Sequence, residues 1–276
     1  MKLLNLYRRD FRFGIIKRGF MFVMPILVAV MQTTECHRIF QYFIENDMIN
    51  THGTIMDYIM YCMQGMFIYH FDTKTQFAIP IYWFIVQIYA AYLVTYYAND
   101  DYDANAKSLF VASRGRGSWW SSKCLWCITT IILYYVVYII SIVILACSYS
   151  ADMSICCTPD FVVSVFNDKA QYLSSGNVIF ISISLSILIT VGMCLVQQIM
   201  TFITNPIASF AFMSAVYIIS AYYTVWWLPG SYTMWLRSSM ITEEGIRPII
   251  GAVLGCTMIF MSWVGGSVYF ESKDVL

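Results

Sequence analysis

Charge is what this sequence has least of. Only 12% of its 276 residues are Asp, Glu, Lys or Arg, whereas 59% are hydrophobic. A soluble domain carries about 25% charged residues, because its surface must be hydrated. The scarcity of charge excludes a chain whose surface mostly faces water, and it predicts that most side chains face lipid or one another.

The sequence also lacks the motifs of an energy-using or hydrolytic enzyme. It has no phosphate-binding loop of the form G-x-x-x-x-G-K-[ST], and its later apolar segments hold almost no ionisable side chain between their ends. Ion-coupled transport usually needs such a side chain inside the membrane, and a hydrolase needs a nucleophile with a base. We therefore expect no catalytic residue, no metal site, no cofactor bound by this chain itself and no nucleic-acid partner.

Histidine and cysteine do not form a recognisable site. The three histidines, His37, His52 and His70, match no metal-ligand spacing. Cys124 and Cys127 have the spacing of a redox dithiol, but they lie in an apolar run and are predicted to pack there. Four further cysteines are candidates for disulfide pairing, in an order that the sequence does not give: Cys36, Cys62, Cys156 and Cys157.

Six segments are long and apolar enough to cross a bilayer, which takes about 20 residues. Lipid offers no hydrogen-bond partner to the backbone, so each is predicted to be a helix. The first lacks a small-x-small cleavage site and is interpreted as a retained span. The fold class predicted is an all-α integral membrane protein, with one transmembrane domain over 1–276 and six spans at about 19–35, 78–97, 123–147, 177–199, 206–228 and 248–270.

Residues 1–18 have the pattern of an amphipathic helix. At about 100° per residue, five apolar side chains fall within one wedge of about 120°, and four basic ones fall roughly opposite. This pattern predicts an interfacial helix on anionic lipid, with a simple topology signal as the alternative. The apolar residues are Leu3, Leu4, Tyr7, Phe11 and Ile15, and the basic ones are Lys2, Arg8, Arg9 and Arg12.

The basic residues also predict the orientation. Eleven of the sixteen lie before the first span, between spans two and three, or after the last span. The positive-inside rule places both termini and the loop 98–122 in the cytoplasm, and it places 36–77, 148–176 and 229–247 outside. Tryptophans near the ends of spans are predicted to lie at the membrane interface, namely Trp119, Trp120, Trp226, Trp227 and Trp235.

Local signals predict three details. Thr54 and Asp57 have the spacing of a capping box, which predicts a helix starting in the first outer segment and packing on the outer ends of the spans. Asn205 before a proline predicts a helix start after a very short turn. Gly251 and Gly255 permit close contact between helices.

Three stretches, SRGRGSWWSSKCLW at 113–126, LPGSYTMWLRSS at 228–239 and GIRPIIG at 245–251, suggest a kinship. Together with the basic leader and the basic loop after span two, they resemble the permease subunit of bacterial ABC exporters, in the six-span family whose ATPase is a separate chain. The resemblance implies a place in the bacterial cytoplasmic membrane and pairing with a second permease chain. It also implies cytoplasmic ATPase subunits that carry ATP and Mg, and an outer gate between spans five and six.

The resemblance gives the leader the role of a connecting helix and the 98–122 loop the role of a coupling loop. The function expected is that of a permease subunit of an ATP-driven exporter of an amphipathic substrate, such as a peptide or antimicrobial compound. The alternatives are an outer-face membrane enzyme and a bacteriocin-immunity protein without transport. Candidate ATPase contacts are Asp100, Asp101, Asp103, Lys107, Ser113, Arg114 and Arg116.

Overall fold

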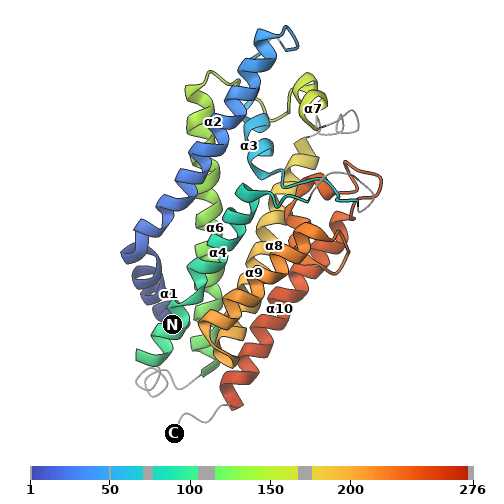
Figure 1. Cartoon of the computed structure of the whole chain (residues 1–276). Helices are drawn as coiled ribbons and strands as arrows, with labels where there is room; N and C mark the ends of the chain where they lie inside the picture. The colour runs from blue at the N-terminus through green and yellow to red at the C-terminus, as the bar shows by residue number, and fades with distance from the viewer. Residues whose placement is uncertain (1, 50, 71–76, 105–115, 167–175, 273–276) are drawn as a thin grey trace.

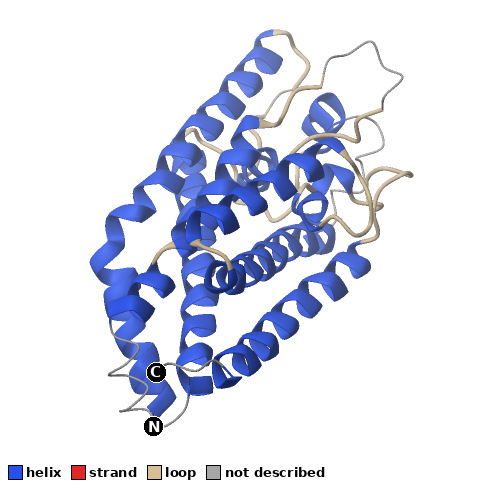
Figure 2. Ribbon diagram, turned by 60° about the horizontal axis from the view of Figure 1, so that its bottom comes forward, coloured by secondary structure: helices blue, strands red, loops and turns tan. Residues whose placement is uncertain are grey.

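The computed structural model of the protein describes residues 2–49, 51–70, 77–104, 116–166 and 176–272. Within these ranges the chain is helical, with two isolated β-bridges and no strand (Figures 1 and 2). The α-helices are α1 Lys2–Asp10, α2 Val23–Glu45, α3 Ile55–Met63, α4 Ile81–Thr95, α6 Arg116–Ser148, α7 Pro159–Phe166, α8 Gly176–Ile203, α9 Pro206–Tyr222 and α10 Pro248–Ser272.

Five helical stretches of the described chain are long and apolar enough to cross a membrane. They are Leu3–Glu45, Ile81–Ala104, Arg116–Ser148, Gly176–Ile203 and Pro248–Ser272. The all-α membrane class predicted from composition agrees with this finding. Both ends of the chain lie at the same end of the bundle, next to the turn between α8 and α9 (Figure 1). We call this the inner end and the opposite one the outer end.

The helix predicted over 206–228 is shorter than expected. α9 stops at Tyr222 after 17 residues, a length of about 26 Å against a hydrocarbon core of about 30 Å. The chain then turns back into the bundle, where Pro229–Thr233 forms a buried 3-10 turn. Arg237 donates to the carbonyls of Ser220 and Ala221, at 2.6 Å each. The Arg237 guanidinium bonds to the last carbonyls of α9 and caps the helix. The helix therefore ends at Tyr222 and does not reach residue 228.

The helix of the first predicted span continues beyond residue 35. α2 continues to Glu45, because residues beyond 35 still bury one face. Phe40 is fully buried and stacks on Phe161 of α7, with ring centroids 4.0 Å apart, and it lies 5.3 Å from the ring of Tyr58. This packing holds the outer part of α2 in a helix above the rest of the bundle (Figure 1).

The leader is not one continuous helix over 1–18. α1 ends at Asp10, a π-helical turn covers Phe11–Ile15, and 3-10 geometry follows with Arg18 outside the helical region. α1 packs on α6, where the Tyr7 hydroxyl lies 2.8 Å from the hydroxyl of Thr129. The predicted apolar wedge is therefore divided, with Leu4 exposed at one end and Ile15 buried at the other.

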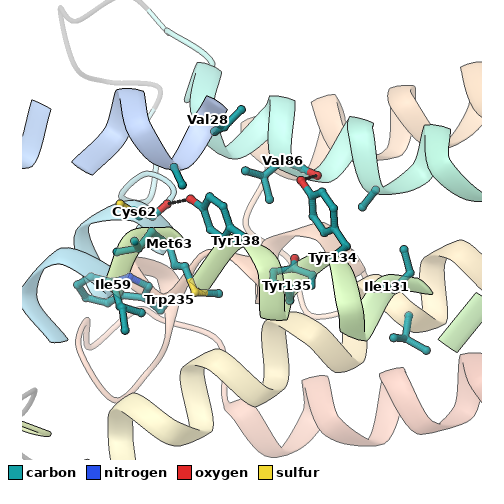
Figure 3. Packing of buried hydrophobic residues seen from close by; sticks show 14 of the residues in the cluster. Val28, Ile59, Cys62, Met63, Val86, Ile131, Tyr134, Tyr135, Tyr138 and Trp235 are labelled. Atoms are coloured by element: carbon teal, nitrogen blue, oxygen red, sulfur yellow. Dashed lines mark hydrogen bonds between the residues drawn. The ribbon is translucent and has the colours of Figure 1, made fainter. Parts of the chain in front are cut away.

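Two segments are inserted into the outer half of the bundle. All residues of α3 except Met56 are buried, and α3 packs against α2, α6 and α4. Residues 229–237 are the second inserted segment. They meet α3 where Trp235 Nε1 donates to the Met60 carbonyl at 2.8 Å. In Figure 3, Trp235 lies beside Ile59 and Met63 of α3. The outer half is thus filled by protein.

The start of α3 confirms the predicted capping box. The Asp57 backbone N–H donates to the Thr54 hydroxyl at 3.3 Å, and the Thr54 N–H donates to the Asp57 carboxylate at 2.8 Å. Asp57 also accepts from the backbone and hydroxyl of Thr158, at 2.9 and 2.7 Å. Burial raises the pKa of Asp57, and these hydrogen bonds oppose the shift. The Asp57 carboxylate therefore connects the outer segment 36–77 to the outer segment 148–176.

Gly251 and Gly255 serve contacts inside this chain. A Cβ at Gly251 would overlap the ring of Tyr232, and one at Gly255 would come within 3.0 Å of Leu188 Cγ on α8. The predicted G-x-x-x-G contact therefore joins α10 to α8 and to the inserted segment.

Candidate functional site

Four charged side chains form an inner-end ionic cluster. Lys123 Nζ lies 2.7 Å from Asp10 Oδ1 and 2.6 Å from Asp101 Oδ2. Arg9 contacts the same two carboxylates, at 3.2 and 2.7 Å. Lys123 and Asp10 are fully buried, and Asp101 is 9% exposed. Two acids and two bases give the cluster a formal charge of zero.

Neutral donors complete the hydrogen bonding of the two carboxylates. Asp10 accepts from Ser122 Oγ at 2.5 Å and from the Tyr97 hydroxyl at 3.1 Å. Asp101 accepts from Trp119 Nε1 at 3.4 Å. A buried ion pair offsets its desolvation cost only when the remaining lone pairs of the carboxylate are hydrogen-bonded. The carboxylates of Asp10 and Asp101 both have such additional hydrogen bonds.

The cluster joins three parts of the chain that are distant in sequence. Asp10 is the last residue of α1, Asp101 lies in the helical residues that follow α4, and Lys123 lies two turns into α6. Asp101 lies near the start of the 98–122 loop, and Lys123 directly follows its end. The cluster therefore fixes the leader to both ends of that loop.

An open hollow of about 410 Å³ lies beside the cluster. Its lining includes Arg9, Asp101 and Tyr97 of the cluster and a second ion pair, Arg18 Nη2 to Asp100 Oδ2 at 3.4 Å. Positive and negative groups line it in equal number, so the lining does not select a ligand of one sign.

Trp119 and Trp120 have a different place from the interfacial one predicted. Both are fully buried between α6 and the inner parts of α8 and α10. The Trp119 ring lies 5.1 Å from that of Phe270, and Trp120 Nε1 donates to the Trp263 carbonyl at 3.1 Å. A Cβ at Gly266 would overlap the Trp120 ring. A tryptophan at the end of an apolar run can be either a core residue or an interfacial residue. The sequence therefore could not show which of the two Trp119 and Trp120 are.

The outer tryptophans differ from one another in burial. Trp226 and Trp227 are 64% and 56% exposed just beyond α9, and their interfacial position stays a prediction. Trp235 is buried at 4% exposure against α3, so it belongs to the core instead.

The structure describes four of the seven candidate ATPase contacts. Asp101 is in the cluster, and Asp100 pairs with Arg18. Asp103 accepts from Asn99 Nδ2 at 3.0 Å, and Arg116 donates to the Glu271 carbonyl at 3.3 Å. The other three, Lys107, Ser113 and Arg114, lie outside the described residues.

α8 carries a stripe of neutral polar side chains, Ser186, Thr190, Gln197 and Thr201. At 100° per residue they fall within about 60° of the helix circumference, and all four are buried. They bond to three other parts of the chain: the Thr233 carbonyl of the inserted turn at 3.4 Å, Gln87 Oε1 and Thr95 Oγ1 of α4 at 3.0 and 2.8 Å, and Ser209 Oγ of α9 at 2.7 Å.

The stripe closes the middle of the bundle. Gln87, Tyr135 and Ser186 surround a cavity of about 10 Å³, which has room for about one water molecule. Tyr138 and Tyr134 of α6 reach backbone carbonyls of α3 and α4, at Cys62 and Val86 (Figure 3). This cavity therefore has no room for a solute larger than water.

The histidines and cysteines of the outer side have structural contacts. The His37 ring stacks on that of Tyr149, with centroids 4.0 Å apart, and His70 Nε2 lies 3.6 Å from Glu244. All nine cysteines are unpaired, and Cys124 and Cys127 are fully buried. Within the described ranges no three His, Cys, Asp or Glu side chains are close enough to hold a metal ion.

Sequence reasoning missed the partnership of Asp10 with Lys123. One signal was present: at 100° per residue, Asp10 lies about 20° from Leu3, at the edge of the apolar wedge and not on the basic face. Lys123 begins a strongly apolar run, where an unpaired ammonium would be costly. An acid on the apolar side of one helix and a base within another predict the ion pair between Asp10 and Lys123. They do not predict that Arg9 and Asp101 join it.

Comparisons with protein-family models, with curated proteins and with solved structures find no match to this chain. The family resemblance therefore remains a hypothesis drawn from short motifs and the order of segments.

Proposed function

We propose that this protein is the membrane-spanning permease subunit of an ATP-driven bacterial exporter of amphipathic molecules. In this proposal α9 is the sixth span, the inner end faces the cytoplasm, and ATP and Mg are bound by separate ATPase chains. The motifs and the positive-inside asymmetry support the orientation.

The observation that supports the proposal most is the inner-end ionic cluster. A coupling loop must pass a partner's movement to the spans, and so it needs stiff connections at both ends. Here Asp101 and Lys123, at the two ends of the loop, are paired with each other and with Asp10 of the leader. Loop, leader and spans two and three would then move as one unit when a partner pulls on the loop.

The closed core supports a pathway formed by two chains. The cavity at the polar stripe holds about one water molecule, so an amphipathic cargo does not fit there. The boundary between two permease chains supplies a route. This is why we propose a pair of permeases, identical or related.

The test is to purify the full chain from its native host and to identify the chains that purify with it. We expect an intact complex whose mass corresponds to two permease and two ATPase chains, with ATP turnover that requires both. An active complex with one permease chain would contradict the shared pathway. A permease that recovers no ATPase would favour the immunity or outer-face alternatives.

A further inference from the structure

The outer end has a pocket with one charged group. It measures about 190 Å³ and lies between α2, α4 and the end of α3. Its lining includes Glu35 of α2, Tyr61 of α3, and Tyr82 and Trp83 of α4. The pocket is separate from the inner-end ionic cluster and shares Cys62 and Trp83 with the small cavity at the polar stripe.

Glu35 is the only charged residue in this lining, and its side chain is exposed. None of the ion pairs between described residues includes it. Glu35, Tyr61 and Tyr82 all contribute to the lining, so the carboxylate borders the pocket together with the two tyrosine side chains.

The walls suit a cation. Tyr61, Tyr82 and Trp83 supply aromatic rings, whose faces attract ammonium groups, and Glu35 supplies the countercharge. Gln32 and Gln64 add amide groups to the lining, and no basic side chain contributes to it. An anionic ligand would meet only repulsion from Glu35.

The surface next to the pocket suits an apolar chain. Leu27 and Met31 precede Glu35 at intervals of four residues, and so lie on the same face of α2. They are 53% and 58% exposed, and Ile81 at the pocket's edge is 68% exposed. A charged pocket continued by an apolar stripe matches a molecule with a cationic head and a hydrocarbon body.

We infer that the pocket at Glu35 binds the ammonium group of an amphipathic amine, with the hydrocarbon part along Leu27 and Met31. Binding itself depends on the pocket alone, whereas a role as the site from which cargo leaves rests on the exporter function proposed above. The ligand approaches from the outer leaflet, because the pocket lies at the outer end of the bundle.

The experiment measures binding of radiolabelled dodecylammonium to the purified full chain in a neutral sugar detergent. Glu35→Gln should weaken binding about fivefold, equivalent to about 1 kcal/mol, because it removes the ion pair at an exposed site and leaves the aromatic rings in place. Glu35→Asp keeps the charge and should stay within about threefold of the unsubstituted chain. Tyr82→Leu should weaken binding about threefold, through loss of one ring.

Glu45→Gln is the matched control, since it makes the same change at an exposed position at the end of the same helix. It should change affinity less than about twofold. Neutral dodecanol should show no difference between Glu35→Gln and the unsubstituted chain. Equal effects at Glu35 and Glu45, an equal effect on dodecanol, or no binding by the unsubstituted chain would overturn the inference. Because the assay uses no ATPase, failed ATP-driven transport with intact Glu35-dependent binding would contradict the exporter proposal alone.

Discussion

Replacing Lys123 by methionine removes the central cation of the inner-end ionic cluster while keeping a side chain of similar length. Asp10 and Asp101 would then share only Arg9, which is about one quarter exposed, at 26%. Both carboxylates would remain buried beside each other. Removing one partner of a buried pair typically costs 3–5 kcal/mol, because a charge is left without compensation. We expect the free energy of unfolding to fall by about 3–5 kcal/mol.

The assay is unfolding in mixed micelles with an increasing fraction of SDS, followed by circular dichroism. The informative comparison is the triple variant Lys123→Met, Asp10→Asn, Asp101→Asn, which removes all three buried charges and leaves only that of Arg9, whose side chain is 26% exposed. We expect the triple variant to recover part of the loss, because hydrophobic or neutral replacements of a whole buried cluster are often tolerated.

Two results would refute this reasoning. One is a loss below about 1 kcal/mol for Lys123→Met, the size of an exposed ion pair. The other is a triple variant less stable than the single one, because that order would mean that the uncompensated charge is not the source of the cost.

Three further predictions follow from other parts of the chain. Arg114→Glu with Arg116→Glu should leave membrane insertion intact but lower the ATPase recovered per permease in a pull-down, more so at low salt; unchanged recovery and transport would reduce these arginines to a topology signal. Cysteine placed at Ser154 should react with an impermeant thiol reagent in intact cells, and cysteine at Ser113 should not; the opposite pattern would reject the proposed orientation. Asp57→Asn should cost about 1–3 kcal/mol in the SDS assay, because one N–H or O–H donor then faces an amide NH₂. Burial raises the pKa of Asp57, so the folded state binds its proton more tightly than the unfolded state does. The stability contributed by this group is thus lost as pH rises through the folded-state pKa, and the advantage over Asp57→Asn should grow on acidification from about pH 7 to about pH 4. A shrinking advantage would show that the hydrogen bonds outweigh burial.

Local signals in the sequence predicted local structure well. The capping box at Thr54 and the cap at Asn205 are both present, the latter with the Ala208 N–H donating to Asn205 Oδ1 at 2.7 Å. Both depend on residues three positions apart, so the sequence contains the whole interaction. The helix expected over 123–147 is also present, as Arg116–Ser148.

The features that the sequence did not predict depend on contacts between residues far apart in the chain. The end of α9 depends on Arg237, which donates to Ser220 and Ala221 from beyond the turn. Burial lowers the pKa of Arg237 to about 10, so it remains charged at neutral pH and continues to cap the helix. Likewise, Trp119 and Trp120 are core residues only because Phe270 and Trp263 reach them from the last helix. No local window contains both partners.

The contact between Trp235 and Met60 has a consequence for how the protein is made. These residues are 175 positions apart, and Arg237 also donates to the Met66 carbonyl at 3.2 Å. Since translation proceeds from the N-terminus, α3 is synthesised long before the segment that seals it. The outer half of the nascent bundle therefore stays open until residue 237 has been delivered, and a loop closure of that length is slow. A ribosome stalled before that point would leave an inserted chain whose inner end is already paired through Asp10, Asp101 and Lys123, while its outer half is still exposed to lipid and to quality-control proteases.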